Sequence, residues 1–338
     1  MAQKTSKRSS GRVTIQDVAA AAKVSAMTVS RALKNPESVS EELRTRVTAA
    51  AAKSGYVMHH AARTLASSQS KLIGVLVPSF SNEVFVDVLA GIRDFLLPRG
   101  YQMMIGDTLY SPEIEEKLFL SYLEHRPDGF LMTGFDSTQK LKGISDANNI
   151  PMVHMMDLSP KHLSVGFSQQ DAGYAMGKYL IERGYRNIVY IAGQIDPRVL
   201  KRRDGLQKAV KEAGRGCKFS EVMVPDPSSV GLGSRMLSRI LEVDPKCDAI
   251  FACNDDLAAG ALFECQRRGI AVPERLAIAG FNDLAFCAWT APNITSITTP
   301  RYQIGYEAAQ LLLQVLNEEK PAKNRIDLGF HLTVREST

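Results

Sequence analysis

The sequence lacks the features of a membrane, secreted or disulfide-stabilised protein. It contains no apolar run long enough to span a bilayer, and the basic first residues MAQKTSKRSSGR are not followed by the apolar segment of a secretory signal. Its five cysteines show neither a CxxC pair nor the spacing of metal ligands. We therefore expect a cytoplasmic protein with free, mostly buried thiols, without a bound metal and without membrane association.

The signatures of common enzyme classes are also missing. HExxH, GxSxG and GxGxxG do not occur, and the segment GLGSRM lacks the last glycine of the dinucleotide-binding pattern. GYAMGKY has three residues between its glycines, where a phosphate-binding loop has four, and Tyr179 replaces the magnesium-binding Ser or Thr. We expect neither a catalytic site nor a cofactor.

What the chain does have is an uneven distribution of charge. Residues 1–68 hold 11 Lys and Arg against 4 Asp and Glu, a net charge of +7, whereas the remaining residues hold 30 against 32, a net charge of −2. A small cationic module on a larger, near-neutral body is typical of a protein that binds a polyanion. A solvated basic tail is the alternative for Lys4, Lys7 and Arg8, so residues 1–12 are predicted to be disordered.

Residues 13–57 predict three short helices. Thr14 is a plausible N-cap of the first helix, a second helix runs from about Ser25 to Lys34, and Ser40 begins a third. This arrangement matches a helix-turn-helix, in which the second helix lies in the major groove of DNA. A purely structural bundle is disfavoured because this helix carries short or hydrogen-bonding side chains suited to bases and phosphates: Ser25, Ala26, Met27, Thr28, Ser30 and Arg31.

From Lys71 onward, short apolar runs alternate with helical patterns. The first series has strands at 72–78, 101–107, 129–134 and 150–157, with helices at 82–97, 112–124 and 137–148. A second series has strands at 187–193, 249–255 and 276–281, with helices at 172–183, 200–213, 228–241 and 257–268. Such alternation indicates buried parallel strands in two doubly wound lobes, whose ligands bind at the carboxyl ends of the strands.

Residues 13–56, VTIQDVAAAAKVSAMTVSRALKNPESVSEELRTRVTAAAAKSGY, resemble the headpiece of the LacI/GalR family of bacterial repressors, with V-T-x-x-D-V-A, V-S-x-x-T-V-S-R and a closing G-Y. LIGVLVPSFSN, CNDDLAAGAL, VPERLAIAGFND and ITSITTPR are similar to the family's effector domain, and ECQRRGI resembles the branch that contains gluconate repressors. The resemblance implies an all-α helix-turn-helix headpiece (13–57), a hinge helix and linker (58–70) and an α/β periplasmic-binding-protein-like domain (71–338). Its N-lobe comprises 71–167 and 300–324, and its C-lobe comprises 168–299 and 325–338.

The resemblance also implies which residues contact DNA. Ala26, Met27 and Arg31 are expected to face operator bases, and Thr14, Ser25, Thr28 and Ser30 to lie near the phosphates. Arg31 suits a guanine or a phosphate, whereas Met27 offers only apolar contact and is equally compatible with partial packing in the core.

Residues 59–66 resemble the family's hinge helix, which enters the minor groove with Arg63 and wedges Leu65 between base pairs. Met58 and His59 stand where the family usually has Pro and Asn, so a solvent-exposed linker is equally compatible with His59 and His60.

The family's effector-binding positions carry over to eight residues of this chain: Ser79, Phe85, Asp157, Phe167, Arg202, Asn254, Asn282 and Arg301. Arg202 can bind a carboxylate with two hydrogen bonds or a pair of hydroxyls. Asn282 stands where sugar-binding relatives commonly have Asp, and Arg301 stands where apolar residues are often found, although it could instead point to solvent. Two arginines and one missing carboxylate suit a sugar acid, because a buried carboxylate needs a partner.

We therefore expect a homodimeric repressor that binds a pseudo-palindromic operator and is released by a sugar acid such as gluconate or a ketogluconate. A neutral sugar and corepression are the alternatives within the family. A two-lobed solute-binding protein would require export and would not carry a basic three-helix module, and a sugar-acid kinase would need a nucleotide motif. No leucine heptads follow the last predicted strand, so we expect a dimer and no tetramer.

Overall fold

The structure is a computed structural model that describes residues 13–56 and 69–338. The predicted basic tail and the predicted hinge positions His59, Arg63 and Leu65 lie outside the described residues. The chain divides into two compact units between Ser70 and Lys71.

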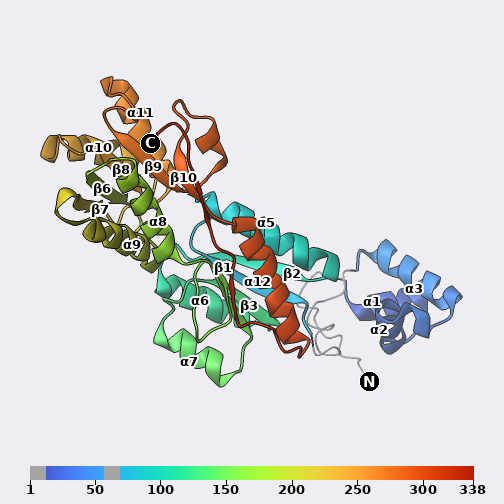
Figure 1. The fold of residues 1–338 in the computed structure, drawn as a ribbon. Helices are drawn as coiled ribbons and strands as arrows, with labels where there is room; N and C mark the ends of the chain where they lie inside the picture. The colour runs from blue at the N-terminus through green and yellow to red at the C-terminus, as the bar shows by residue number, and fades with distance from the viewer. Residues whose placement is uncertain (1–12, 57–68) are drawn as a thin grey trace. The chain divides into compact units, whose positions relative to one another are not determined.

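The N-terminal unit is built from three helices, α1 (Ile15–Ala22), α2 (Ala26–Lys34) and α3 (Glu41–Ser54), with a 3₁₀ turn at Pro36–Ser38 (Figure 1). Thr14 caps α1 through a capping box, in which the Asp17 carboxylate accepts a hydrogen bond from the Thr14 N–H at 2.8 Å. Lys23 ends α1 in the left-handed conformation, which permits the tight turn into α2. The predicted helix-turn-helix is confirmed.

In the C-terminal unit, the N-lobe contains a parallel sheet of order β11-β5-β4-β3-β1-β2. Its strands are β1 (Leu72–Val77), β2 (Gln102–Asp107), β3 (Gly129–Thr133), β4 (Met152–Met155), β5 (Ser164–Gly166) and β11 (Arg325–Asp327). Its helices are α5 (Val84–Leu96), α6 (Pro112–Leu123), α7 (Gln139–Ala147) and α12 (Arg301–Leu316). Figure 1 shows α5 and α12 side by side on one side of the sheet and α6 and α7 on the other.

The C-lobe repeats this design with the order β12-β10-β9-β8-β6-β7, in which only β12 is antiparallel to its neighbour. Its strands are β6 (Asn187–Ala192), β7 (Lys218–Met223), β8 (Ala249–Ala252), β9 (Ala277–Asn282), β10 (Thr295–Thr298) and β12 (His331–Thr333). Its helices are α8 (Gln169–Glu182), α9 (Pro197–Ala213), α10 (Val230–Val243) and α11 (Asp255–Arg268). The predicted pair of doubly wound lobes is confirmed.

The chain crosses between the lobes three times, after β5, after β10 and after β11. The last crossing corrects the expected boundary, which placed residues 325–338 entirely in the C-lobe. Strand β11 pairs in parallel with β5, with Arg325 opposite Ser164 and Asp327 opposite Gly166, so it belongs to the N-lobe sheet. A three-residue edge strand with polar, exposed ends carries no periodic signal by which the sequence could assign it.

Paired glycines bring three pairs of helices into close contact. A Cβ atom added to Gly91 in α5 would overlap the carbonyl oxygen of Tyr302 in α12, and one added to Gly305 would overlap that of Val88. The pairs α8/α9 and α10/α11 have the same reciprocal arrangement, at Gly173 with Gly205 and at Gly233 with Gly260. Only glycine permits backbones to approach this closely.

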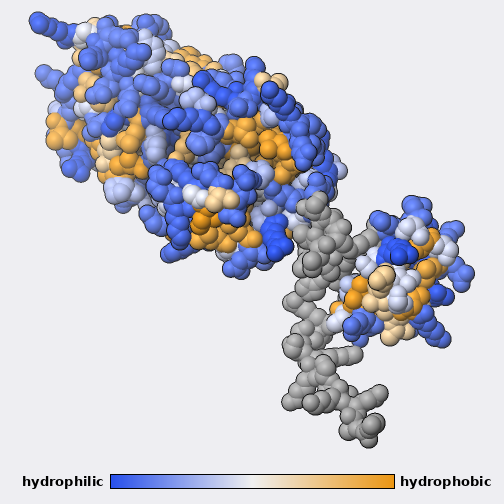
Figure 2. Space-filling model, turned by 90° about the horizontal axis from the view of Figure 1, so that it is seen from below, coloured by the Kyte–Doolittle hydropathy of each residue, from blue (hydrophilic) through white to orange (hydrophobic). Residues whose placement is uncertain are grey.

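On the face drawn in Figure 2, the surface of the described residues is largely hydrophilic, with separate hydrophobic patches. Within residues 13–56 and 69–338, no helix is both long enough and apolar enough to cross a membrane. All five cysteines are free, and four of them are buried, which confirms the prediction from their spacing.

Candidate functional site

Helix α2 presents two side chains of the predicted DNA-binding set to solvent. Met27 is 73% exposed, so the alternative that it packs in the core does not hold, and Arg31, one turn later on the same face, is exposed as well. Ser25 caps the helix, accepting a hydrogen bond from the N–H of Thr28 at 3.1 Å. Ala26, Thr28 and Ser30 are half-buried beside this face, and Thr14 is exposed at the start of α1.

A second candidate site is a cavity between the two lobes, at the carboxyl ends of strands from both sheets. The N-lobe contributes Asn82, Val84, Phe85, Tyr110 and Met156. The C-lobe contributes Gln194, Asp196, Arg198, Val199, Arg202, Asn254 and Asn282. The cavity volume is about 20 Å³, which is room for about one water molecule. A sugar-sized ligand therefore requires the lobes or the side chains to move apart.

Arg202 is a buried cation without a carboxylate partner among the described residues. Its Nε donates to Oε1 of Gln169 and its Nη1 donates to the carbonyl oxygen of Cys253, both at 2.7 Å. The guanidinium lies 3.8 Å from the centre of the Phe281 ring. Burial lowers the pKa of Arg202 from its ordinary value, because removing the charged form from water is costly. An anionic ligand would relieve this cost.

Asn254 and Asn282 come from adjacent strand ends and contact each other beside Arg202. The Asn282 Nδ2 donates to Oδ1 of Asn254 at 3.1 Å, and the same oxygen lies 3.4 Å from Nη1 of Arg202. Asn282 is 1% exposed, and its Oδ1 has no hydrogen-bond partner within the part of the chain that the structure describes. An unsatisfied buried acceptor is costly, so this oxygen is suited to a ligand hydroxyl.

The structure adds Arg198, which sequence reasoning missed. It lies one turn before Arg202 on α9, is 7% exposed and forms an ion pair with Asp196 at 2.8 Å. Although burial raises the pKa of Asp196, the charge and hydrogen bonds of Arg198, the charge of Arg202 and the Val199 N–H together keep that pKa below its ordinary value. The omission has a clear cause: α9 was predicted to begin at residue 200 but begins at Pro197, so the shared face of the two arginines was not recognised.

Tyr110 lies on the N-lobe side of the same cavity. Its hydroxyl accepts a hydrogen bond from Nδ2 of Asn82 at 3.1 Å, and burial raises its pKa to about 12. The phenol is therefore neutral at physiological pH and can itself donate to a ligand oxygen.

Of the eight predicted effector-binding residues, Phe85, Arg202, Asn254 and Asn282 line this cavity, and the other four do not. Ser79 is within hydrogen-bond distance of Ser81, and Phe167 is fully buried against Phe281. Asp157 forms an ion pair with Lys201 of the opposite lobe.

Arg301, the fourth of these residues, is paired with Asp87 at 2.9 Å, and its Nη1 donates to the carbonyl oxygen of Asn282. It therefore links the N-lobe to the end of β9 from outside the cavity.

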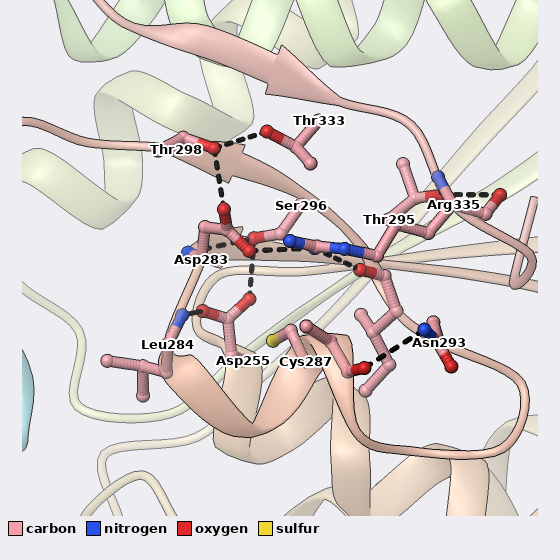
Figure 3. Close-up of polar contacts among 12 residues, drawn as sticks. Asp255, Asp283, Leu284, Cys287, Asn293, Thr295, Ser296, Thr298, Thr333 and Arg335 are labelled. Atoms are coloured by element: carbon pink, nitrogen blue, oxygen red, sulfur yellow. Dashed lines mark hydrogen bonds and ion pairs between the residues drawn. The ribbon is translucent and has the colours of Figure 1, made fainter.

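A polar network surrounds Asp255 and Asp283, the residues that follow Asn254 and Asn282 in the chain (Figure 3). Asp255 accepts hydrogen bonds from the Ser296 hydroxyl at 2.6 Å and from the Leu284 N–H at 2.8 Å. Asp283 forms an ion pair with Arg335 at 2.7 Å. The network holds the turn after β9, where Asn282 and Asp283 have φ values of 102° and 55°, in a conformation that non-glycine residues rarely adopt. It thereby fixes the direction of the Asn282 side chain.

Comparison with known proteins identifies the family of each unit. The pattern of bacterial regulatory proteins of the lacI family matches residues 14–58, and that of a periplasmic binding protein-like domain matches residues 178–338. The chain is 45% identical over 333 residues to the HTH-type transcriptional regulator GntR of Pseudomonas aeruginosa, with coverage of 98% of this chain and 97% of that one.

Solved structures give the same result. A GntR transcription regulator from Chromobacterium violaceum is 48% identical with a TM-score of 0.77, covering 79% of this chain and 98% of that one. A LacI-family transcriptional regulator from Silicibacter pomeroyi is 33% identical with a TM-score of 0.90, covering 96% and 99%. The chain therefore belongs to the lacI family of bacterial regulatory proteins and is a transcriptional regulator with a helix-turn-helix DNA-binding domain.

Proposed function

We propose that this regulator is a cytoplasmic repressor of sugar-acid utilisation genes, which binds a pseudo-palindromic operator as a homodimer and releases it when gluconate or a related sugar acid binds between the lobes. The charge of the cavity is the observation that supports an anionic ligand. Arg198 and Arg202 contribute two positive charges to its wall, whereas Asp196 contributes the single carboxylate among the described lining residues.

The two arginines have different roles in this proposal. Asp196 already neutralises Arg198 and orients it, with hydrogen bonds to both its Nε and its Nη2. Arg202 has only neutral partners within the described residues, so it is the cation available to a ligand carboxylate. The Asn282 Oδ1 and the Tyr110 hydroxyl supply an acceptor and a donor for sugar hydroxyls. This set favours a polyhydroxy acid over a neutral sugar.

On the DNA side, the proposal assigns the exposed face of α2 to the major groove. Arg31 would bind a guanine or a phosphate, and Met27 would contact an apolar group such as a thymine methyl. Ser25, Thr28 and Ser30 would set the position of the helix on the backbone. The hinge contacts of His59, Arg63 and Leu65 remain part of the proposal by family resemblance alone.

Ligand binding can change the relative position of the lobes through contacts that join them next to the cavity. Lys201, adjacent to Arg202, holds Asp157 of the N-lobe, and Arg301 of the N-lobe holds the backbone of Asn282. A ligand that binds Arg202 and Asn282 therefore affects both of these contacts between the lobes. It shifts the regulator toward release only by its differential affinity for the two conformations.

The decisive experiment compares Arg202→Ala with Arg203→Ala in calorimetry with gluconate and in operator-binding assays. Arg203 is adjacent on α9, pairs with Asp204 and lies outside the cavity, so it is the matched control. Arg202→Ala should weaken gluconate binding by about 2–5 kcal/mol while leaving operator affinity intact, because a buried charged partner is lost. Tighter binding of a neutral sugar than of any sugar acid by the unmodified protein would refute the anionic ligand class.

A further inference from the structure

A second cavity lies in the N-lobe, apart from the cleft between the lobes. It has a volume of about 250 Å³ and is bounded by α7, by β4, by the loop after β3 and by the loop before β5. No residue of this cavity lines the interlobe cavity. Its size approaches that of typical small-molecule sites, and nothing in the proposed repressor mechanism uses it.

The walls of this cavity are aromatic. The rings of Phe135 and His154 have centroids 4.6 Å apart, and His162 lies 5.9 Å from Phe135 and 5.4 Å from His154. Leu141, Ile150, Met152 and Leu163 add apolar side chains to the lining, and Ser137 and Ser145 add hydroxyl groups. Planar rings pack well against such a surface.

His154 gives the cavity a buried hydrogen-bond acceptor. The residue is 9% exposed, and its Nδ1 lies 2.6 Å from the carbonyl oxygen of Gly134. A carbonyl only accepts, so Nδ1 carries the proton and Nε2 presents a lone pair. Burial lowers the pKa of His154 to about 4, which keeps the ring neutral at physiological pH. Nε2 has no hydrogen-bond partner among the described residues.

The charged groups at this cavity are Lys142, Lys161 and Asp146. Lys142 donates to the carbonyl oxygen of Phe135 at 3.2 Å, whereas Lys161 is exposed on the loop before β5. Two cations against one carboxylate leave one net positive charge among the Lys and Asp side chains of the lining. The cavity therefore combines aromatic and apolar side chains, an acceptor on His154 and a net positive charge.

We propose that this cavity is a second small-molecule site, which takes an aromatic or heteroaromatic carboxylate bearing a ring hydroxyl or N–H. The ring packs against Phe135 and His162, the hydroxyl or N–H donates to Nε2 of His154, and the carboxylate lies near Lys161. A site in the N-lobe but outside the interlobe cleft would give the regulator a second input, independent of the ligand proposed for the cleft.

The test uses calorimetric titration of the full-length protein with 4-hydroxybenzoate, with benzoate as the matched probe that lacks the hydroxyl. We expect saturable binding of 4-hydroxybenzoate and about ten-fold weaker binding of benzoate, because benzoate leaves the His154 acceptor without a partner. His154→Phe keeps a ring but removes the acceptor, so it should bind the two probes equally. If the unmodified protein binds both probes equally, or binds neither, the proposal is overturned.

Surface variants keep the test valid even if His154→Phe fails to fold. Lys161→Ala should weaken 4-hydroxybenzoate binding by about two- to five-fold, as expected for an exposed charge, whereas Lys117→Ala, an exposed lysine on α6, should leave it unchanged. Arg202→Ala should also leave it unchanged. If Arg202→Ala abolishes binding of 4-hydroxybenzoate, the probe binds in the interlobe cleft, and the second site is overturned. The proposed repressor function would be unaffected by that result.

Discussion

Asp255 is a fully buried carboxyl group next to Asn254, and its titration should affect stability. Burial raises its pKa from 3.8 to about 7, despite the hydrogen bonds from Ser296 and Leu284. Between these two pH values the unfolded chain releases a proton that the folded protein retains. Stability from this group is therefore complete below about pH 4 and is lost as the pH rises toward 7.

The variant Asp255→Asn should remove this dependence. We expect the free energy of unfolding of the unmodified protein to fall between pH 4 and pH 7 more steeply than that of the variant, by up to about 1.4 kcal/mol per pH unit. Glu115, whose pKa burial raises to about 7, titrates in both proteins and cancels in the comparison. Urea unfolding at several pH values measures the difference, and parallel curves would contradict the role of Asp255.

Some residues of the interlobe cavity could be predicted from the sequence, and others could not. Arg202, Asn254 and Asn282 were predicted from the family pattern, and the structure brings all three together in the cavity. Arg198 was missed because its role depends on where α9 begins, which Asp196 as an N-cap decides. The pairing of Arg301 with Asp87, 214 residues earlier in the chain, depends on the packing of α5 on α12, which local patterns do not encode.

At the scale of helices, replacing glycine by alanine should have opposite effects on stability at a close helix contact and at an open helix position. Gly305→Ala should destabilise the protein by about 1–3 kcal/mol, because its new methyl group overlaps the backbone of Val88 in α5. Gly143→Ala in α7 is the matched control: its Cβ meets no atom within 4 Å, so helix propensity should stabilise it by up to about 1 kcal/mol. Thermal unfolding should give melting temperatures on opposite sides of the unmodified protein. Equal shifts would contradict the close helix contact.

The strands that are long and buried were predictable, whereas a half-exposed edge strand and a three-residue buried strand were not. Buried strands such as β1 and β9 appear in the sequence as continuous apolar runs, so their positions were predicted within a residue or two. Strand β7 lies at the edge of its sheet, exposed at Lys218 and Glu221 and half-buried elsewhere, and β5 has three residues, so neither was recognised. At the edge of its sheet, β7 buries too little apolar surface to leave a pattern, whereas β5 is buried between β11 and β4 but is too short to show one.

For the whole molecule, charge asymmetry predicts strong salt dependence of DNA binding. Residues 1–68 carry a net charge of +7, and the rest of the chain carries −2, so DNA phosphates should be neutralised by the N-terminal unit alone. Operator affinity should fall by about 10³ to 10⁵ between about 50 and 200 mM salt if some 6–10 phosphates are contacted. Fluorescence anisotropy with labelled operator measures this slope. A shallow slope, or one that persists after removal of residues 1–68, would contradict the assignment.

The three crossings between the lobes also determine the order in which a nascent chain can fold. The N-lobe sheet begins with β1 but is completed by α12 and β11, which leave the ribosome only after the β6–β10 part of the C-lobe. At about 5–20 residues per second, roughly 10–30 s separate the synthesis of β5 from that of β11. During that time β3 and β4 lack the helix that covers them in the finished protein. The core of the N-lobe therefore stays incomplete until almost the whole chain has been synthesised.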